Sequence, residues 1–516
     1  MANNPYVNKV VNAETNTTLI DLTSDTAVAA DVAQGKYFHL ATGERVQGTS
    51  TGGGGTEAGT VTQDQDGYLV LDDDPPTHIT VESLSVTQNG TYTAPTGKAY
   101  SPVTVNVSGG GGDMSDPIRF FDYDGTLVAS YSSVPASLPS VPTHTGLTNG
   151  TWNYTLAQVT TQFNAMGTCD VGANYETVSG ATEIDIELQE GRLHPYLSLA
   201  VNGTVTIDWG DNSTDTATGT SLTTRVSNIN HEYAAAGSYT IKITKTSGTG
   251  YSLYCSSTYT LLNKQDTTGN ANRVYSNCVK AVRVGADCTI GAYAFGYCFS
   301  LESVSIPSSV TSIGGYSFYY CWTLEFVSIP SGVTSTGGNT FNYCCSLASV
   351  SIPSTVTTIS NSFSSCYSLA SVSIPSGVTT INGSAFQTCY ALASASIPSG
   401  VTSIGTNTFT TCQTLTSVTI PSGVTSISNS LLSGCISLAS SVTIPSGVTS
   451  IGIYAFSNCC GVTEYHFEST TPPTLANVNA FNNIPSDCII YVPSAKLNDY
   501  KTAENWSTYA SYMVGE

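Results

Sequence analysis

One stretch decides the fold of this 516-residue chain: Leu301-Glu302-Ser303-Val304-Ser305-Ile306-Pro307-Ser308-Ser309-Val310-Thr311-Ser312-Ile313-Gly314-Gly315-Tyr316-Ser317-Phe318-Tyr319-Tyr320-Cys321. The phrase recurs, with small substitutions, as far as Cys459. Its proline returns every 22 to 24 residues, at Pro307, Pro330, Pro353, Pro375, Pro398, Pro421 and Pro445. Its cysteine keeps the same period, at Cys298, Cys321, Cys344, Cys366, Cys389, Cys412, Cys435 and Cys459. Two residue types that share one period identify an internal repeat, whose units must stack because none buries its apolar side alone.

The apolar positions of the phrase predict the inside of one coil. In the unit quoted above, the residues expected to point inward are Leu301, Val304, Ile306, Val310, Ile313, Phe318 and Cys321. Proline after the short strand prevents its extension, because proline has no N–H to donate to a strand ladder. We therefore expect a mainly β chain in which residues 270–465 form a solenoid of about eight 23-residue coils. Residues 466–516 are expected to cap its last open edge.

The repeat resembles the BspA-type leucine-rich repeat of bacterial and phage surface proteins. Ile451-Gly452-Ile453-Tyr454-Ala455-Phe456-Ser457-Asn458-Cys459 matches the end of that family's phrase closely. The resemblance implies a leucine-rich-repeat solenoid.

Upstream of the solenoid, two glycine runs at 52–55 and 109–112 are typical of flexible joints between small β modules. The segments expected to be modules are residues 57–108, residues 113–181, which hold one helix near Thr155–Met166, and residues 182–250. In the last of these, Asp208-Trp209-Gly210-Asp211-Asn212, followed by His231-Glu232-Tyr233, resembles a PKD-type β-sandwich.

The N-terminal sequence resembles the opening of phage virion proteins. The residues that carry this resemblance are Leu19-Ile20-Asp21-Leu22-Thr23-Ser24-Asp25-Thr26 and Gly35-Lys36-Tyr37. Asn89–Pro95 with Ala99–Val105 is similar to a small module of phage tail and fibre proteins, and residues 118–180 resemble another phage structural module. The resemblance implies that residues 1–51 dock the chain on other virion proteins. The docking candidates are Leu19, Asp21, Leu22, Thr23, Asp25 and Tyr37. It also implies a homo-oligomer on the virion surface.

Composition and charge narrow the possible partners. The chain has 15 Lys+Arg against 36 Asp+Glu, a formal net charge of −21, which argues against binding to nucleic acid. The same charge, and the lack of a long apolar run, argue against a membrane surface or a membrane span. The first residues show no secretory signal peptide, which predicts synthesis in a host cytoplasm and reduced thiols at folding.

Three stretches suggest chemistry, and each has a simpler structural interpretation. Phe121-Asp122-Tyr123-Asp124-Gly125 resembles the nucleophile motif of haloacid-dehalogenase-type phosphatases, but that fold needs helices alternating with parallel strands, so an Asp-Gly turn is favoured. The cysteines come once per coil rather than in metal-binding clusters, which favours a structural role. Asp64-Gln65-Asp66-Gly67 and Asp72-Asp73-Asp74 could bind calcium, but solvated turns are favoured. The sequence therefore predicts no enzyme and no cofactor.

Aromatic residues flank the cysteine row and differ between coils. The ligand-binding candidates are Tyr297, Phe299, Tyr320, Trp322, Tyr343, Tyr367 and Tyr390. Tyr and Trp are favoured at binding hot spots, but the same rings could pack coil on coil. We interpret the chain as a virion protein of fibre or tail type whose solenoid recognises a bacterial surface glycan, a surface protein or a mucosal ligand. The alternatives are a capsid-attached head fibre or decoration protein, and a bacterial cell-surface adhesin.

Overall fold

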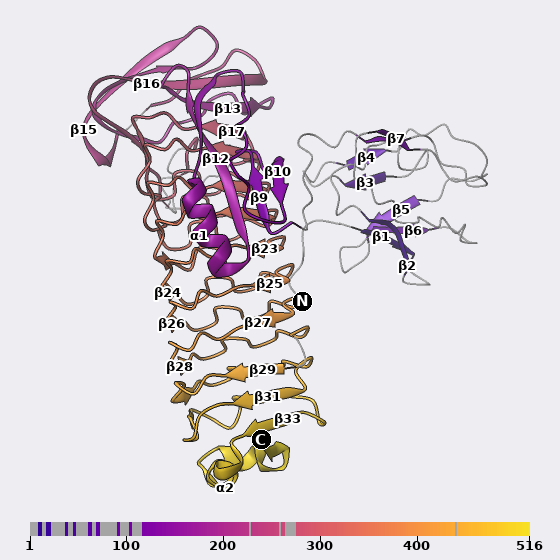
Figure 1. Cartoon of the computed structure of the whole chain (residues 1–516). Helices are drawn as coiled ribbons and strands as arrows, with labels where there is room; N and C mark the ends of the chain where they lie inside the picture. The colour runs from indigo at the N-terminus through magenta and orange to yellow at the C-terminus, as the bar shows by residue number, and fades with distance from the viewer. Residues whose placement is uncertain are drawn as a thin grey trace. The chain divides into compact units, whose positions relative to one another are not determined.

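The computed structural model describes residues 116–226, 229–256, 260–263, 275–438 and 441–516, together with eight short strands within residues 1–115 (Figure 1). The chain divides into two compact units, Met1–Ser108 and Gly109–Glu516. The solenoid and the structure that packs directly on it all belong to the second unit.

In the first unit, one four-stranded sheet has the order β2-β1-β6-β5, and β3-β4 and β7-β8 are antiparallel pairs. The strands are β1 (Lys9–Asn12), β2 (Thr17–Asp21), β3 (Tyr37–His39), β4 (Arg45–Gln47), β5 (Thr60–Gln63), β6 (Leu69–Asp72), β7 (Gly90–Tyr92) and β8 (Val103–Val105). Because β1 pairs with β6, strands from both sides of the first glycine run share one sheet.

The solenoid carries two rows of short strands, and most of these strands pair in parallel with the equivalent strand of a neighbouring coil (Figure 1). The first row is β17 (Val279–Arg283), β19 (Ser303–Ser305), β20 (Phe326–Ser328), β21 (Ser349–Ser351), β23 (Ser371–Val372), β25 (Ser394–Ala395), β27 (Ser417–Val418), β29 (Ser441–Ile444), β31 (Glu464–Phe467), β33 (Ile489–Val492) and β34 (Met513–Gly515). The second row is β18 (Cys288–Ile290), β22 (Thr358–Ile359), β24 (Thr380–Ile381), β26 (Ser403–Ile404), β28 (Ser426–Ile427), β30 (Ser450–Ile451) and β32 (Thr474–Leu475).

The solenoid has about 10 coils of roughly 23 residues, against the eight expected from the sequence. The difference arises at the ends, where coils that lack the full repeat phrase still stack. After the last coil come η2 (Ser494–Lys496), α2 (Leu497–Thr502) and η3 (Trp506–Tyr512). Trp506 is fully buried there, and its indole nitrogen donates to the Pro473 carbonyl oxygen at 2.7 Å.

The core follows the predicted inward positions, since all seven residues expected inside the quoted unit are at most 4% exposed. The phenylalanines stack in a file, with ring centroids 5.1 Å apart at Phe295–Phe318 and 5.6 Å apart at Phe386–Phe409.

The repeat cysteines lie beside this file, and all of them are buried free thiols. The Cys366 Sγ donates to the Phe341 carbonyl oxygen of the preceding coil at 3.1 Å, and the same bond recurs for the cysteines at Cys321, Cys344, Cys389, Cys412 and Cys435. Cysteine therefore fills a core position and also satisfies a buried carbonyl.

The residue before each repeat cysteine adopts a left-handed backbone conformation. This position is occupied by Thr388 (φ 62°), Thr411 (φ 61°) and Asn458 (φ 60°) in three of the coils. A β-branched residue is strained there, by about 1–2 kcal/mol, whereas asparagine tolerates the conformation.

Replacing Thr388 by Asn is therefore expected to stabilise the protein by about 0.5–1 kcal/mol, as relief of this strain. Urea denaturation would measure the change. The control is Thr379→Asn, at a position outside the set of left-handed residues. Equal effects of the two substitutions would mean that backbone strain is not the cause.

An N-terminal sheet closes the other end of the solenoid. Its strands β13 (Thr182–Leu188), β14 (Leu199–Asp208), β15 (Thr214–Val226) and β16 (Gly237–Leu253) continue into the solenoid, with the order β15-β14-β16-β13-β17-β19. β16 also pairs with β18, so both strand rows begin on this sheet. The PKD-type resemblance of this segment stays a prediction.

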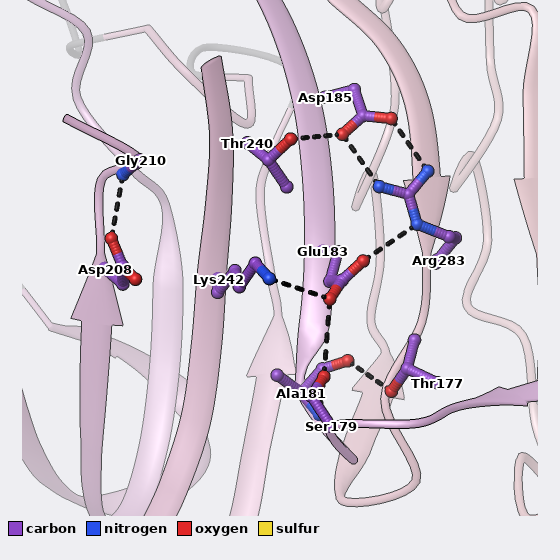
Figure 2. A network of polar contacts seen from close by, with 10 residues as sticks. All are labelled: Thr177, Ser179, Ala181, Glu183, Asp185, Asp208, Gly210, Thr240, Lys242 and Arg283. Carbon is purple, nitrogen blue, oxygen red and sulfur yellow. Dashed lines mark hydrogen bonds and ion pairs between the residues drawn. The ribbon is translucent and has the colours of Figure 1, made fainter. Parts of the chain in front are cut away.

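An ion-pair network ties this sheet to the first coil (Figure 2). Arg283 on β17 donates to both oxygens of Asp185 on β13, at 2.7 and 2.8 Å, and to Glu183 at 3.0 Å. The Thr240 hydroxyl also donates to Asp185, at 2.7 Å. Burial raises the pKa of Asp185, but the hydrogen bonds from Arg283 and Thr240 outweigh burial and lower the pKa below its ordinary value. The network therefore favours the charged form of Asp185.

Residues 116–177 form a second small sheet with the order β10-β9-β12-β11, in which β9 and β12 are parallel. Its elements are β9 (Ile118–Phe121), β10 (Leu127–Tyr131), β11 (Leu147–Trp152), α1 (Leu156–Met166) and β12 (Cys169–Thr177). The helix confirms the predicted one: Thr155 and Gln158 form a capping box at its start, and Gly167 ends it with φ 72°. We call residues 116–177 the clamp, because they lie along the strands of the solenoid (Figure 1).

Candidate functional site

Eight aromatic rings gather on one flank of the first coils, and we call this surface the aromatic face. Its members are Tyr293, Tyr297, Phe299, Tyr316, Tyr319, Tyr320, Trp322 and Tyr343. The rings stack from coil to coil: Tyr297–Tyr320 centroids are 5.4 Å apart, Tyr320–Tyr343 4.6 Å and Phe299–Trp322 4.2 Å. The predicted candidates on these coils thus come together, and Tyr367 and Tyr390 form a further stacked pair at 5.1 Å.

Local backbone geometry places these rings. Tyr297, Tyr320 and Tyr343 occupy the left-handed position before the cysteine, with φ of 61–65°, and Tyr293 and Tyr316 occupy a second such position earlier in the coil. Both positions are outside the core file, so a large side chain there lies along the flank. Sequence reasoning missed Tyr293, Tyr316 and Tyr319, although their recurrence four residues before, or next to, the recognised tyrosines could have revealed them.

Most rings of the aromatic face are half-buried against one another. Burial raises the pKa of Tyr293 and of Tyr319, and in Tyr319 a hydrogen bond with Tyr320 adds to the effect. These phenols therefore remain neutral hydrogen-bonding groups in the physiological pH range. Because stacking occupies ring faces, the face presents ring edges and hydroxyl groups.

The serines that point outward from the strand row form a second surface, and the clamp covers its first part. Asn174 donates to the carbonyl oxygens of Ile306 and Ser328, at 3.1 and 3.2 Å. Asn153 donates to the Ile329 carbonyl oxygen at 3.0 Å and to the Ser351 hydroxyl at 2.8 Å. Further clamp contacts are Tyr154 to the Ile352 carbonyl oxygen at 2.7 Å and Gln162 to the Ile374 carbonyl oxygen at 2.9 Å. The strand surface becomes accessible only beyond these coils, where Ser394, Ser396, Ser417 and Thr419 are exposed.

The phosphatase-like motif lies at the end of β9 in the clamp. Asp122 is 3% exposed, and its carboxylate accepts hydrogen bonds from the Tyr175 hydroxyl and the Tyr123 backbone N–H, both at 2.8 Å. Its second oxygen lies 2.7 Å from His144 Nε2. Asp124 accepts from the Thr126 backbone N–H at 2.9 Å, as expected for a turn residue. These contacts support the structural interpretation of the motif.

The turn at Asp211 is likewise explained by its own contacts. The Asp211 carboxylate lies 2.7 Å from His231 Nε2, and the Ser213 hydroxyl and backbone N–H donate to it. Burial raises the pKa of Asp211, but the hydrogen bonds from Ser213 and His231 outweigh burial and hold the pKa at about 2. Trp209 stacks on His231 with centroids 5.1 Å apart, so these residues pack together.

Within the described ranges, no three His, Cys, Asp or Glu residues are arranged to hold a metal ion. The suggested calcium loop at Asp64–Gly67 lies outside the described residues, and of Asp72–Asp74 only Asp72 lies within them, at the end of β6. Of the docking candidates, Leu19 and Asp21 lie in β2 and Tyr37 in β3, whereas Leu22, Thr23 and Asp25 lie outside the described residues. In the described part of the chain, no helix has the length and apolar character needed to cross a membrane.

Comparison with solved structures finds leucine-rich-repeat proteins at low identity. A leucine-rich repeat protein from Bacteroides ovatus is 24% identical over 40% of this chain and 55% of its own, with a TM-score of 0.35. This chain thus spans little more than half of that protein. A leucine rich cell surface protein from Faecalibacterium prausnitzii is 27% identical over 43% of this chain and 81% of its own, with a TM-score of 0.23. The pneumococcal vaccine antigen PcpA is 16% identical over 48% of this chain and 71% of its own, with a TM-score of 0.32.

No curated protein matches the chain. The family model of the BspA type leucine rich repeat region, however, matches residues 288–414 and 379–500. That span includes strands β18 to β33, the phenylalanine file and the cysteine row described above, so residues 288–500 are BspA-type leucine-rich repeats.

Proposed function

We propose that this chain is a phage virion protein of fibre or tail type, whose solenoid recognises a bacterial surface or mucosal ligand without covalent chemistry. The aromatic face is the observation that carries the recognition role. The virion location is supported by the resemblance of residues 1–51 to phage virion openings. A head fibre or decoration protein, and a bacterial adhesin, are the alternatives; the adhesin is compatible with the likeness to bacterial leucine-rich-repeat proteins.

The aromatic face suits recognition for physical reasons. Its rings are held by stacking on successive coils, as at Tyr320–Tyr343, so little side-chain entropy is lost when a ligand binds. Tyrosine and tryptophan offer large contact areas together with a polar group, which is why they dominate binding hot spots. The repeat scaffold beneath them is rigid because each coil hydrogen-bonds to the next.

Replacing Tyr320 and Trp322 by Ala is expected to reduce binding of the protein to its target cells at least tenfold. Loss of the stacked rings should also cost about 1–3 kcal/mol of stability, since such pairs contribute about 0.5–1.5 kcal/mol each beyond their buried area. Flow cytometry with fluorescent protein measures the binding, and urea denaturation measures the stability.

The matched control removes a stacked pair at the other end of the solenoid. His466 and Tyr491 stack with centroids 4.7 Å apart, and their replacement by Ala should leave cell binding intact. A second variant, Tyr316→Phe with Tyr343→Phe, keeps every ring and removes two hydroxyl groups, so its folding is preserved and its binding should still fall. Wild-type binding by both aromatic-face variants would contradict the recognition role of this face.

Removing residues 1–108 is expected to release the protein from virions. The whole unit is removed because β1 and β2 share a sheet with β5 and β6, so deletion of residues 1–51 alone would break that sheet. The truncated protein should keep the melting temperature of the solenoid unit. Co-sedimentation with purified particles measures attachment, and full occupancy by the truncated protein would place the anchor elsewhere. A full-length protein found on bacterial envelopes and never on particles would favour the adhesin alternative.

A further inference from the structure

A polar cavity of about 160 Å³ lies where the clamp ends on the strand surface of the solenoid. The clamp contributes Arg119 from β9 and Thr168 and Asp170 from the start of β12. The solenoid contributes outward hydroxyl groups from three successive coils, at Ser371, Ser373, Ser394, Ser396, Ser417 and Thr419. Hydrogen-bonding groups share the lining with the apolar residues Val372, Ala395 and Val418, so a ligand meets both polar and apolar surface. The exposed residues Ser394, Ser396, Ser417 and Thr419 lie on the solenoid side of the cavity.

The charged groups of the cavity are fixed in place and compensate each other. Arg119 donates from Nε and Nη2 to the two carboxylate oxygens of Asp170, at 2.8 and 2.9 Å. Nη2 also donates to the Ser371 hydroxyl at 2.9 Å, and the guanidinium lies 5.5 Å from the centre of the Phe121 ring. The Asp170 side chain is 2% exposed and that of Arg119 is 13% exposed. A ligand thus meets a rigid polar wall with no net charge.

We propose that this cavity binds one sugar unit of a neutral polysaccharide. The paired charges leave no net field to select an anion, whereas hydroxyl groups that both donate and accept hydrogen bonds complement the hydroxyl groups of a sugar. Beyond the cavity the same two outward positions recur in the next coil as Ser441 and Thr443, which are both exposed. Neighbouring strands lie about 4.8 Å apart, close to the advance per unit of an extended sugar chain, so following units can contact successive coils.

This site deepens the proposed function by naming a ligand class, but it is separate from the aromatic face. An experiment can therefore contradict ligand binding at one of the two sites without contradicting it at the other. Loss of oligosaccharide binding in a cavity variant, with retention in the Tyr320→Ala, Trp322→Ala variant, would assign the sugar to the cavity.

Isothermal titration of the full chain with cellohexaose, maltohexaose and mannohexaose tests the proposal, with hexagalacturonate as the acidic probe. We expect at least one neutral oligosaccharide to bind, and Ser394→Ala with Thr419→Val to weaken its binding at least tenfold. Both residues are exposed, so the variant should fold as the wild type does.

The matched control is Ser403→Ala with Thr402→Val, the same types of substitution at two exposed residues of the second strand row, on and beside β26 and outside the cavity lining. This variant should keep most of the wild-type affinity. The proposal is overturned if no neutral oligosaccharide binds at millimolar concentration, if only the acidic probe binds, or if the cavity and control variants bind alike.

Discussion

Raising the pH about one unit above 9.0, the ordinary pKa of a cysteine thiol, is expected to unfold the solenoid. Burial raises the pKa of the eight repeat thiols well above that value, at Cys298, Cys321, Cys344, Cys366, Cys389, Cys412, Cys435 and Cys459. The folded protein therefore keeps these protons at a pH where the unfolded chain releases them.

The sign and the size of this loss of stability follow from proton linkage. The stability contribution of each thiol is fully present below 9.0 and is lost as the pH rises toward the folded-state pKa, because only the unfolded state ionises in that window. Above pH 9.0, each buried thiol lowers the free energy of unfolding by about 1.4 kcal/mol per pH unit. Eight thiols therefore lower it by on the order of 10 kcal/mol within the first pH unit above 9.0. That is comparable to the entire stability of an ordinary domain.

Circular dichroism during alkaline titration, together with far-ultraviolet thiolate absorbance, measures this effect. In a Cys460→Ser background, which removes an exposed thiol outside the file, the two signals should change together, because ionisation of the repeat thiols requires unfolding. In the Cys366→Ser variant the hydroxyl can still donate to the Phe341 carbonyl oxygen. The free energy of unfolding of this variant should fall less steeply with pH, because seven repeat thiols ionise on unfolding instead of eight. Thiolate absorbance that rises while the fold persists would contradict the buried file of thiols.

Replacing Gly172 by Ala is expected to detach the clamp from the solenoid, at a cost of about 3 kcal/mol from overpacking. Gly172 lies on β12 against the strand row, and an added Cβ would lie 2.6 Å from the Cβ of Ser328 and 3.0 Å from that of Ser351. Both contacts are too close for carbon atoms, so the strand must move away. Hydrogen exchange of β20 and β21, together with urea denaturation, measures the detachment.

A second substitution can restore the space. Ser328→Gly removes the nearer of the two obstructing carbon atoms, and the Ser328 hydroxyl has no hydrogen-bond partner whose loss would add a cost. The double variant should therefore recover part of the lost stability, whereas Ser328→Gly alone should not stabilise the protein. If Gly172→Ala melts and exchanges like the wild type, the clamp does not pack on the solenoid in this way.

The repeat made the solenoid predictable. Because Val304 and Phe318 recur with one period, a single unit defines which side chains enter the core of every coil, and the structure buries them. A helix near Thr155–Met166 was likewise predicted, and the structure has α1 there, with Thr155 capping its start. Coils at the ends of the solenoid, such as the one that contains β33, were harder to predict because they stack without the repeat phrase found in the other coils.

The clamp on the strand surface could not be predicted in the same way. Asn153 and Asn174 have side chains that read as ordinary loop or strand polar groups, yet each donates to carbonyl oxygens more than 130 residues away in sequence. Such contacts depend on shape and leave no periodic signal. The aromatic candidates were found because they flank the cysteines, but Tyr319 joins them through edge-to-face contacts with Tyr297 and Tyr343 of the adjacent coils.

Hydroxyl-radical footprinting of the full chain on its target tests the central claim, recognition by the aromatic face, most directly. The probe is envelope fragments of a bacterium that retains the protein, and chymotryptic peptides are needed because residues 284–495 contain no Lys or Arg. We predict protection concentrated at Tyr316, Tyr320, Trp322 and Tyr343 on binding. Protection confined to the clamp or the C-terminal coils, with these rings labelled as in the free protein, would contradict the claim.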